Sequence, residues 1–319
     1  MKSALSLLFF TFLFAASLLT GNVSLDLSQL FVPGSQEATI LLQLRVPRTL
    51  LAFLSGGILA LSGLLFQTIF RNPLTTPFTL GISSGATLGA SVAILTGWGA
   101  HALLGISTVE LFGFLGALTT LWLIYTISRR LDSTGSNRLI LAGIALSYLY
   151  GALLLLFYYM SDFEESFMIT RYTMGSLLTA GMQEITIVGI GAALLLRVAL
   201  HYRKALKYLS VSRDFASLQG IDVGHVTIRL FLLISLSVGM LVAITGPIGF
   251  IGLVVPHMVR LLLRRTVDGL IWPVFYFGGI FLLLCDLLSR MLPTFSPLPV
   301  GIVTSMIGGV IFIFILLKR

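Results

Sequence analysis

The sequence predicts an all-α integral membrane protein with about ten transmembrane helices. The first observation is composition: of 319 residues, 57% are hydrophobic and only 10% are charged, and the mean hydropathy is +1.03. A soluble domain of this length needs far more charge to cover its surface. The second observation is that apolar residues form continuous runs of about 20, the length of a helix that spans the hydrocarbon. An outer-membrane barrel would alternate polar and apolar residues instead.

Ten runs are predicted to span the membrane within a single domain that covers residues 1–319. They are residues 3–20, 47–70, 79–97, 109–128, 138–160, 184–202, 227–246, 248–264, 271–290 and 299–317. The first run follows one lysine and contains small residues, so it also resembles a secretory signal peptide. A transmembrane helix is favoured because the rest of the chain is itself membrane-embedded and needs no cleaved signal.

The distribution of charge sets the expected orientation. With both termini in the cytoplasm and ten crossings, only four basic residues fall at the outer face: Arg45, Arg48, Arg171 and Arg290. The other basic residues outside the helices fall in or beside cytoplasmic loops, as the positive-inside rule requires. The net charge of +8 therefore indicates membrane topology, and no nucleic-acid partner is expected.

An interruption separates the second and third predicted helices. Arg71, Asn72 and Pro73 end the second helix at the cytoplasmic side, because proline cannot continue it. Three glycines then recur every fourth residue, and small residues at that spacing allow helices to approach closely in lipid. Helix packing is favoured over a substrate-facing groove for these residues, which are Gly81, Gly85 and Gly89.

The longest predicted cytoplasmic connection covers residues 203–229. Within it, residues 212–224 predict a short helix, a glycine turn at Gly220 and a second helix start at Asp222. Two short helices on the cytoplasmic face would form a platform for another protein. An interfacial helix that rests on lipid headgroups is an equally good interpretation.

Residues 245–265 combine glycines, prolines and ionisable residues within predicted membrane segments. Such groups are tolerated where neighbouring protein or a water-lined cavity satisfies them. Helix packing or a transport pathway would use Gly246, Pro247, Gly249, Gly252, Pro256 and His257. A structural role for His257 is favoured over a proton relay or ligand role, since only Arg260 accompanies it. Asp286 and Arg290 lie four residues apart, which predicts an ion pair on one helix face.

Several classes of function are disfavoured by what the sequence lacks. The single cysteine, Cys285, lies in an apolar run, and the four histidines have no metal-ligand spacing. No catalytic motif or P-loop is present, so neither a metal site nor a cofactor is expected and any ATP must be used by another chain. A secondary transporter would need accessible intramembrane acids. Only Asp286 qualifies, and Arg290 is beside it.

Five motifs together resemble one family of membrane proteins. They are "RVPRTLLAFLSGGILALSGLLFQTIFRNPLTTPFTLGISSGATLGA" (45–90), "YTMGSL" (172–177), "DFASLQGIDV" (214–223), "GPIGFIGLVVPHMVRLL" (246–262) and "LPVGIVTSMIGGVIFIFILL" (298–317). These resemble the permease subunits of bacterial type II ABC importers for iron–siderophore complexes, haem and vitamin B12. The resemblance covers nearly the whole chain.

The resemblance implies a fold like the vitamin B12 importer permease in the inner membrane. It implies as partners a second permease chain (identical or related), two cytoplasmic ATPase subunits and a soluble or lipid-anchored binding protein. Outer arginines of the family dock the binding protein and match Arg45, Arg48 and Arg290. The cytoplasmic gate matches Ser136 and Asn137. The ATPase-coupling helices match Asp214, Phe215, Ala216, Leu218, Gln219, Gly220 and Asp222. An iron–siderophore is the expected cargo, with haem and cobalamin as alternatives.

Overall fold

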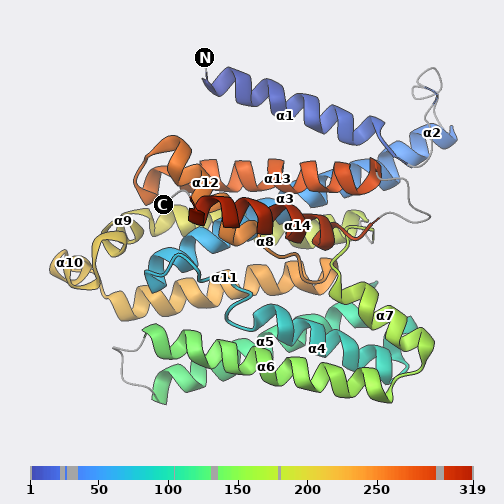
Figure 1. Cartoon of the computed structure of the whole chain (residues 1–319), viewed down its shortest axis with the longest axis horizontal. Coiled ribbons are helices and arrows are strands. Elements are labelled where there is room, and N and C mark those ends of the chain that lie inside the picture. Colours follow the sequence, from blue (N-terminus) through green and yellow to red (C-terminus); the bar gives the residue numbers. More distant parts are fainter. Residues whose placement is uncertain are drawn as a thin grey trace.

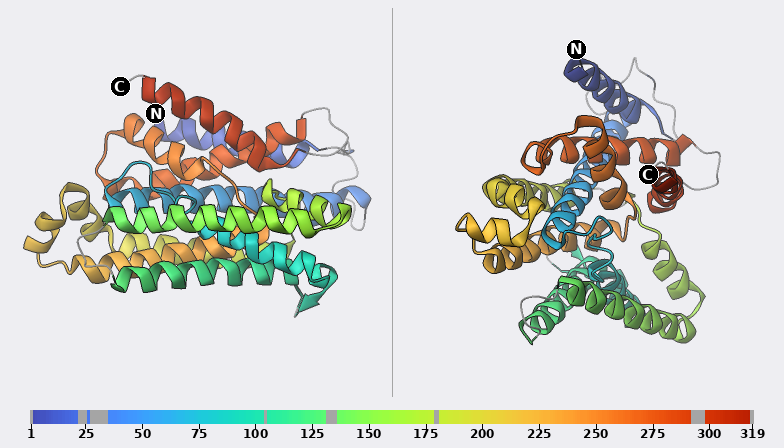
Figure 2. Two further views of the ribbon diagram at one scale, coloured as in Figure 1. Left: turned by 60° about the horizontal axis from the view of Figure 1, so that its bottom comes forward. Right: turned by 60° about the vertical axis from the view of Figure 1, so that its left-hand side comes forward.

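The computed structural model is a bundle of helices that mostly run along one long axis (Figures 1 and 2). It describes residues 2–21, 26, 35–103, 105–130, 136–178, 181–291 and 298–317. The longer helices are α1 (Lys2–Leu19), α3 (Val46–Phe70), α4 (Ile82–Leu95), α5 (Thr108–Arg130), α6 (Ser136–Met160), α8 (Met182–His201), α11 (Val223–Thr245), α12 (Ile251–Leu263), α13 (Ile271–Met291) and α14 (Val300–Leu317). The shorter elements are α2 (Gln36–Thr39), η1 (Ile40–Arg45), η2 (Trp98–Ala100), β1 (Ala102–Leu103), β2 (Ile106–Ser107), α7 (Phe163–Thr173), α9 (Arg203–Val211), α10 (Arg213–Leu218) and η3 (Val267–Gly269).

The helices of the described residues fit the expected class. Seven helical segments are long and apolar enough to cross a membrane, and three shorter apolar helices accompany them, at Leu8–Leu19, Ile82–Leu95 and Ile251–Leu263. The strands β1 and β2 form only a two-residue antiparallel pair. The prediction of an all-helical membrane protein with about ten membrane helices is therefore confirmed.

A long helical segment, Gln36–Phe70, occupies the centre of the bundle. It joins α2, the π-helical η1 and α3 without a break. Of its most apolar stretch 83% is buried, against 11% for Arg138–Met160 in α6. The sequence placed the start of this helix at residue 47, with Arg45 ahead of it, but the helical segment begins at Gln36 and contains both Arg45 and Arg48. Hydropathy marks only the part of a helix that suits lipid, so it missed the polar first turns that Ser35 caps.

Glycines let the backbones around α3 touch directly. A Cβ added to Gly63 would lie 1.9 Å from the carbonyl oxygen of Gly252 in α12, and one added to Gly56 would lie 2.2 Å from that of Gly278 in α13. Neither distance leaves room for any side chain. Close approach of this kind replaces the hydrophobic driving force that helices lack in lipid.

The segment between α3 and α4 is irregular but well bonded. Arg71 ends α3 in the left-handed conformation, with φ 51°, and α4 begins part-way along the bundle (Figure 1). Asn72 Oδ1 accepts from the backbone of Leu74 at 2.9 Å, and the Thr79 hydroxyl accepts from the backbone of Thr76 at 2.9 Å. These local bonds replace the helical ones that Pro73 and Pro77 forbid.

Two connecting segments contain more helix than the sequence predicted. α7 lies where an outer loop was expected, and it opens with a capping box in which Asp162 and Glu165 bond each other's backbone N–H. α9 is likewise an unpredicted amphipathic helix. α10 occupies the position of the first predicted short helix. The second predicted start, at Asp222, is the N-cap of the long α11, so α11 begins before residue 227.

We expect Gly63→Ala to destabilise the fold by about 1–3 kcal/mol, because overpacking forces α3 and α12 apart. The matched control is Gly189→Ala in α8, where the nearest atom to an added Cβ is 4.0 Å away. Thermal unfolding of purified protein in detergent measures both. Equal midpoints for the two variants would mean that the α3–α12 crossing tolerates a methyl group.

Candidate functional site

The expected site residues fall at the two ends of the bundle and at one junction between them. One end, here the α7 end, carries α2, α7 and the C-terminus of α1; the other, the α10 end, carries α9 and α10 (Figure 1). The start of α1 and the end of α14 both lie toward the α10 end (Figures 1 and 2).

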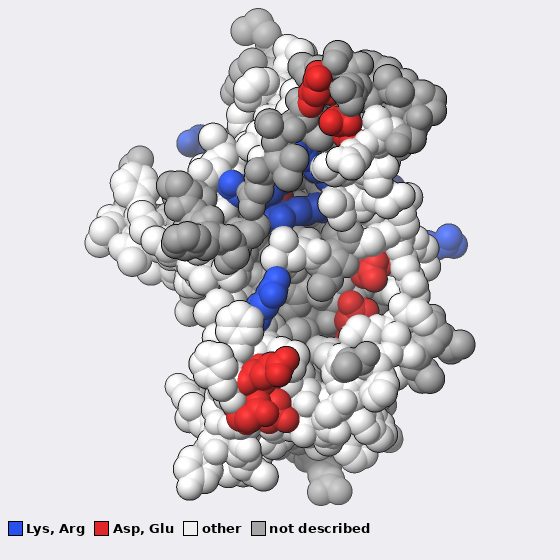
Figure 3. Space-filling model, turned by 90° about the vertical axis from the view of Figure 1, so that its right-hand side faces the viewer, with Lys and Arg blue, Asp and Glu red and all other residues white. Residues whose placement is uncertain are grey.

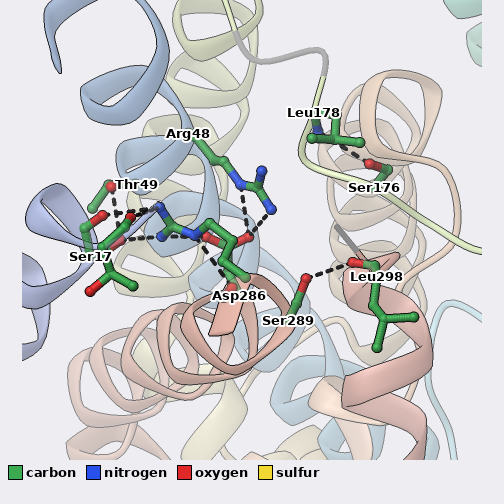
Figure 4. A network of polar contacts seen from close by, with 10 residues as sticks. Ser17, Arg48, Thr49, Ser176, Leu178, Asp286, Ser289 and Leu298 are labelled. Carbon is green, nitrogen blue, oxygen red and sulfur yellow. Dashed lines mark hydrogen bonds and ion pairs between the residues drawn. The ribbon is translucent and has the colours of Figure 1, made fainter. Parts of the chain in front are cut away.

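A buried carboxylate shared by two arginines organises the α7 end (Figure 4). Asp286 in α13 is completely buried. Its Oδ1 accepts from Arg48 Nε at 2.9 Å and Nη2 at 2.8 Å, and its Oδ2 lies 2.7 Å from Arg290 Nη2. The ion pair expected between Asp286 and Arg290 is therefore confirmed. Arg48 comes from α3, and no spacing rule in the sequence could have assigned it to the same carboxylate.

The C-terminus of α1 binds two of the arginines. Arg290 Nη1 donates to the carbonyl of Ser17 at 3.0 Å, and its Nη2 donates to the Ser17 hydroxyl at 2.6 Å. Arg45 Nη1 donates to the carbonyls of Leu18 at 2.9 Å and Leu19 at 2.6 Å. The last carbonyls of a helix have no intrahelical partner and form the negative end of its dipole. Both guanidinium groups thus replace missing helix bonds.

Arg48 and Arg290 share the single carboxylate of Asp286, which leaves this cluster of three groups with one positive charge in excess. Arg45 is only 6% exposed, Arg290 is 8% exposed, and the Arg48 side chain is 13% exposed. Their described contacts are thus largely internal, and direct docking of a partner remains a prediction. On this face several basic side chains lie near the centre and others lie at the edges, while acidic side chains form separate groups above and below the centre (Figure 3).

Three distant segments meet in a junction next to α4. Tyr172 Oη donates to the carbonyl of Val242 at 2.8 Å, and the N–H of Ser176 donates to Thr245 O at 2.7 Å. Burial, with the charge of Glu110 second, raises the pKa of Tyr172, so its hydroxyl stays a neutral donor.

Glycines again make this junction possible. Gly175 and Gly246 have positive φ values of 69° and 65°. A Cβ on Gly246 would lie 2.3 Å from Tyr172 O, and one on Gly301 would lie 2.2 Å from Met174 O. The junction therefore brings together the motifs at residues 172–177, 246–262 and 298–317.

A cavity of about 220 Å³ lies between α4 and α6, next to this junction. Its lining includes hydroxyl groups and no charged side chain, and among the expected site residues only Pro247 belongs to it. The lining residues that the sequence analysis missed are Phe78, Ser83, Ser84, Thr87, Tyr150, Gly151, Leu154 and Thr173. The four-residue spacing of Ser83 and Thr87 on α4 is the signal that could have found them.

The glycines of α4 lie against other helices. A Cβ on Gly85 would meet Thr120 Oγ1 of α5 at 1.9 Å, and one on Gly89 would meet Phe112 O at 2.1 Å. Gly81 has φ 77° and approaches the carbonyl of Gly143 in α6. The serine and threonine side chains of α4 are thus the ones that line the cavity.

The remaining residues expected in this region lie in or beside α12. Gly252 packs on α3, Pro256 is buried, and His257 is partly buried. A Cβ on Gly249 would still be 3.5 Å from Ser305 Oγ, so Gly249 is not closely packed. The sequence pattern grouped these residues, but the structure gives them different surroundings.

At the α10 end, α10 presents an exposed surface. Ser212 caps it by accepting from the N–H of Phe215 at 2.9 Å, and the Phe215 ring packs on Tyr208 with centroids 5.7 Å apart. Leu218 is 83% exposed. Ala216 is fully buried and so supports the helix rather than its surface. The other expected coupling residues, Asp214, Gln219, Gly220 and Asp222, are exposed.

The predicted gate residues lie at the start of α6, which begins at Ser136. The side chains of Ser136 and Asn137 are outside the described part of the structure. Within the described residues, no three His, Cys, Asp or Glu side chains come together as metal ligands would.

Comparison with known families decides the class of the chain. The model of the FecCD transport family matches residues 7–318. The chain belongs to the FecCD transport family. A hemin transport system permease, HmuU of Yersinia pestis, is 34% identical over 94% of this chain and 90% of its own length. The molybdate import system permease MolB of Haemophilus influenzae is 33% identical over 86% of this chain and 80% of its own.

A solved structure agrees with this FecCD assignment. It is an inward-facing metal-chelate type ABC transporter, it is 28% identical, and it superimposes with a TM-score of 0.85 over 99% of this chain and all of that one. This FecCD chain is therefore an ABC importer permease, a multi-pass membrane protein and a transport component rather than an enzyme.

We expect Asp286→Asn to destabilise the protein by about 3–5 kcal/mol, because it leaves two buried guanidinium groups without their counter-charge. Arg48→Gln should cost clearly less, since Asp286 keeps Arg290. Thermal unfolding of the two variants in one detergent measures the order. A larger loss for Arg48→Gln than for Asp286→Asn would contradict the role of Asp286 as the shared counter-charge.

Proposed function

We propose that this chain is the permease of a binding-protein-dependent importer that carries an iron–siderophore or a related metal chelate across the inner membrane. The main support for this proposal is the full-length similarity to a metal-chelate type transporter. The cavity beside α4 supports a large organic cargo, because its lining mixes hydroxyl groups with aromatic and aliphatic side chains. Such a lining contacts a chelate without binding it tightly, as a pathway requires.

A second permease chain would complete the pathway. The apolar stretch of α6 is mostly unburied in the single chain, and its exposed large side chains include Tyr148, Leu155 and Tyr159. An exposed apolar helix beside the cavity fits a partner helix or lipid. Symmetry favours two identical chains over a pair of relatives.

The excess positive charge of the Arg48–Asp286–Arg290 cluster supports docking of the binding protein at the α7 end. Arg48 and Arg290 share one buried carboxylate, so one positive charge of this cluster is not neutralised within it. Acidic groups on a binding protein would be oriented by this charge, which sets register more than affinity. The Arg48 side chain is more exposed than that of Arg290, so we expect Arg48 to contribute more to docking of the binding protein.

The α10 end is the proposed cytoplasmic side and the docking site of the ATPases. Exposed Leu218 and Phe215 offer apolar contact on a helix that Ser212 holds in place. ATP binding would draw the ATPases together, and α10 would transmit that motion as a rigid body. Ser136 and Asn137, at the same end of α6, would form the gate. Both termini are then cytoplasmic.

The alternatives differ in cargo or in energy source. Haem or cobalamin could use the same cavity, and a molybdate importer is among the relatives. An ion-coupled secondary transporter would need an accessible acid in the membrane. The two arginines on Asp286 count against it, since a carboxylate neutralised in this way does not take up a cation.

Deletion of this gene should abolish uptake of labelled iron–siderophore and leave uptake of haem, cobalamin and molybdate unchanged. The reason is that one permease serves one binding protein. Uptake by the deletion strain, with the intact gene restored as control, measures this. Loss of only one of the other three cargoes would reassign the substrate within the family, and unchanged uptake of all four would reject the proposal.

Two variants should distinguish docking of the ATPase at the α10 end from docking of the binding protein at the α7 end. Leu218→Glu is expected to reduce co-purification of the ATPase at least tenfold while binding-protein docking persists, because a buried charge at an apolar contact costs about 2 kcal/mol or more. Arg48→Gln should weaken binding-protein docking and spare the ATPase.

Lys204→Gln is the matched control at the α10 end, because it changes the charge by the same amount on an exposed position of α9. An equal loss of ATPase with Lys204→Gln and Leu218→Glu would contradict a specific role for α10. Unchanged docking of the binding protein by Arg48→Gln would remove the arginine proposal.

A further inference from the structure

A second cavity, which has a polar lining, lies at the α10 end. It has a volume of about 220 Å³ and is partly open to the surface. The end of α3, α9 and α12 enclose it, and its lining includes Gln67, Thr68, Arg71, Ser210 and Arg260. No acidic residue lines it. Two arginines thus share a cavity that offers them no counter-charge.

Arg260 and Gln67 leave polar atoms without partners in this cavity. The Nε of Arg260 is buried and has no hydrogen-bond acceptor among the described residues. The Oε1 of Gln67 is also buried, and no described residue donates a hydrogen bond to it. Gln67 is held in place because its Nε2 donates to Gly252 O at 3.1 Å. A buried guanidinium N–H without an acceptor is costly, so the cavity has an unfilled requirement for an oxygen atom.

Arg71 reaches the cavity from the other side. It adopts a left-handed backbone, with φ 51°, at a position where glycine would be less strained. Its Nη2 donates to Val211 O at the end of α9 at 3.0 Å, which fixes the guanidinium group and leaves further N–H donors.

The surroundings of Arg71 are also basic. Burial, and then the charge of Arg71, lowers the pKa of Arg213. Asp268, next to the cavity residue Val267, bonds Thr266 and faces Lys207, and these contacts lower its pKa. Asp268 does not line the cavity, although its Oδ1 is buried with no hydrogen-bond partner among the described residues.

We propose that this cavity binds a phosphate group, with Arg260 and Arg71 as its ligands. The bidentate fork of an arginine matches phosphate oxygens. Gln67 Oε1 accepts from a hydroxyl or ammonium group next to the phosphate. An anionic phospholipid headgroup and a soluble phosphate share this chemistry.

Water alone does not meet the requirement of the cavity. The volume would hold several waters, each of about 30 Å³, and one of them could accept from Arg260 Nε. Water does not neutralise two guanidinium groups, whereas a phosphate supplies a charge and several acceptor oxygens.

Detergent-purified protein tests the site with three probes: phosphatidylglycerol, phosphatidylcholine and inorganic phosphate. Phosphatidylglycerol should raise the thermal midpoint and phosphatidylcholine should not. Arg260→Gln should weaken the response to phosphatidylglycerol about tenfold, the typical value of one charge-assisted contact. Arg264→Gln, at an exposed position at the end of the same helix, should change it less than about twofold on the same scale.

A response to inorganic phosphate as strong as that to the lipid would assign the site to a soluble phosphate. Ser210→Asp provides a check if Arg260→Gln fails to fold. This substitution places a carboxylate in the cavity, so it should raise the midpoint without any probe and abolish the lipid response. Equal effects of the two lipids, equal losses in the two arginine variants, or an unaltered response in Ser210→Asp would each overturn the proposal.

Discussion

Direct contact between glycine backbones around α3 is the constraint on which the rest of the structure depends. It fixes the axial register of α3 against both neighbours. Arg48 lies eight residues before Gly56, and Asp286 lies eight residues after Gly278, so the antiparallel crossing of α3 and α13 brings them level. Arg71 and Arg260 each lie eight residues beyond the contact of Gly63 with Gly252. The glycines therefore position the charged groups at both ends of the bundle.

The two ends use arginine differently. At the α7 end, three arginines gather around one buried carboxylate and the open carbonyls of α1, so almost every charge has a partner within the chain. At the α10 end, Arg260 and Arg71 line a cavity without an acid. Arg71 is exposed to solvent, so the cost of an unpaired charge in a low-dielectric environment falls mainly on the partly buried Arg260. This contrast separates an internal structural network from the cavity that we propose as a phosphate site.

The membrane class and the about ten apolar helices could be predicted because lipid imposes a length and a composition on each span. Helices outside lipid lack that signal: α7 and α9 were missed, although Asp162 and Glu165 show a capping pattern. The pair of Asp286 with Arg290 followed from helical spacing. The approach of Arg48 to Asp286 did not, since it depends on how two distant helices cross. The hydroxyl-lined cavity beside α4 was missed because the glycines drew attention to the opposite side of that helix.

The position of Cys285 has a further consequence. The only thiol of the chain lies in α13, fully buried beside Asp286. Thiol reagents in the surrounding medium therefore meet no accessible thiol, and two copies of the chain cannot become cross-linked through a disulfide. The thiol–disulfide balance on either side of the membrane therefore leaves the fold unchanged.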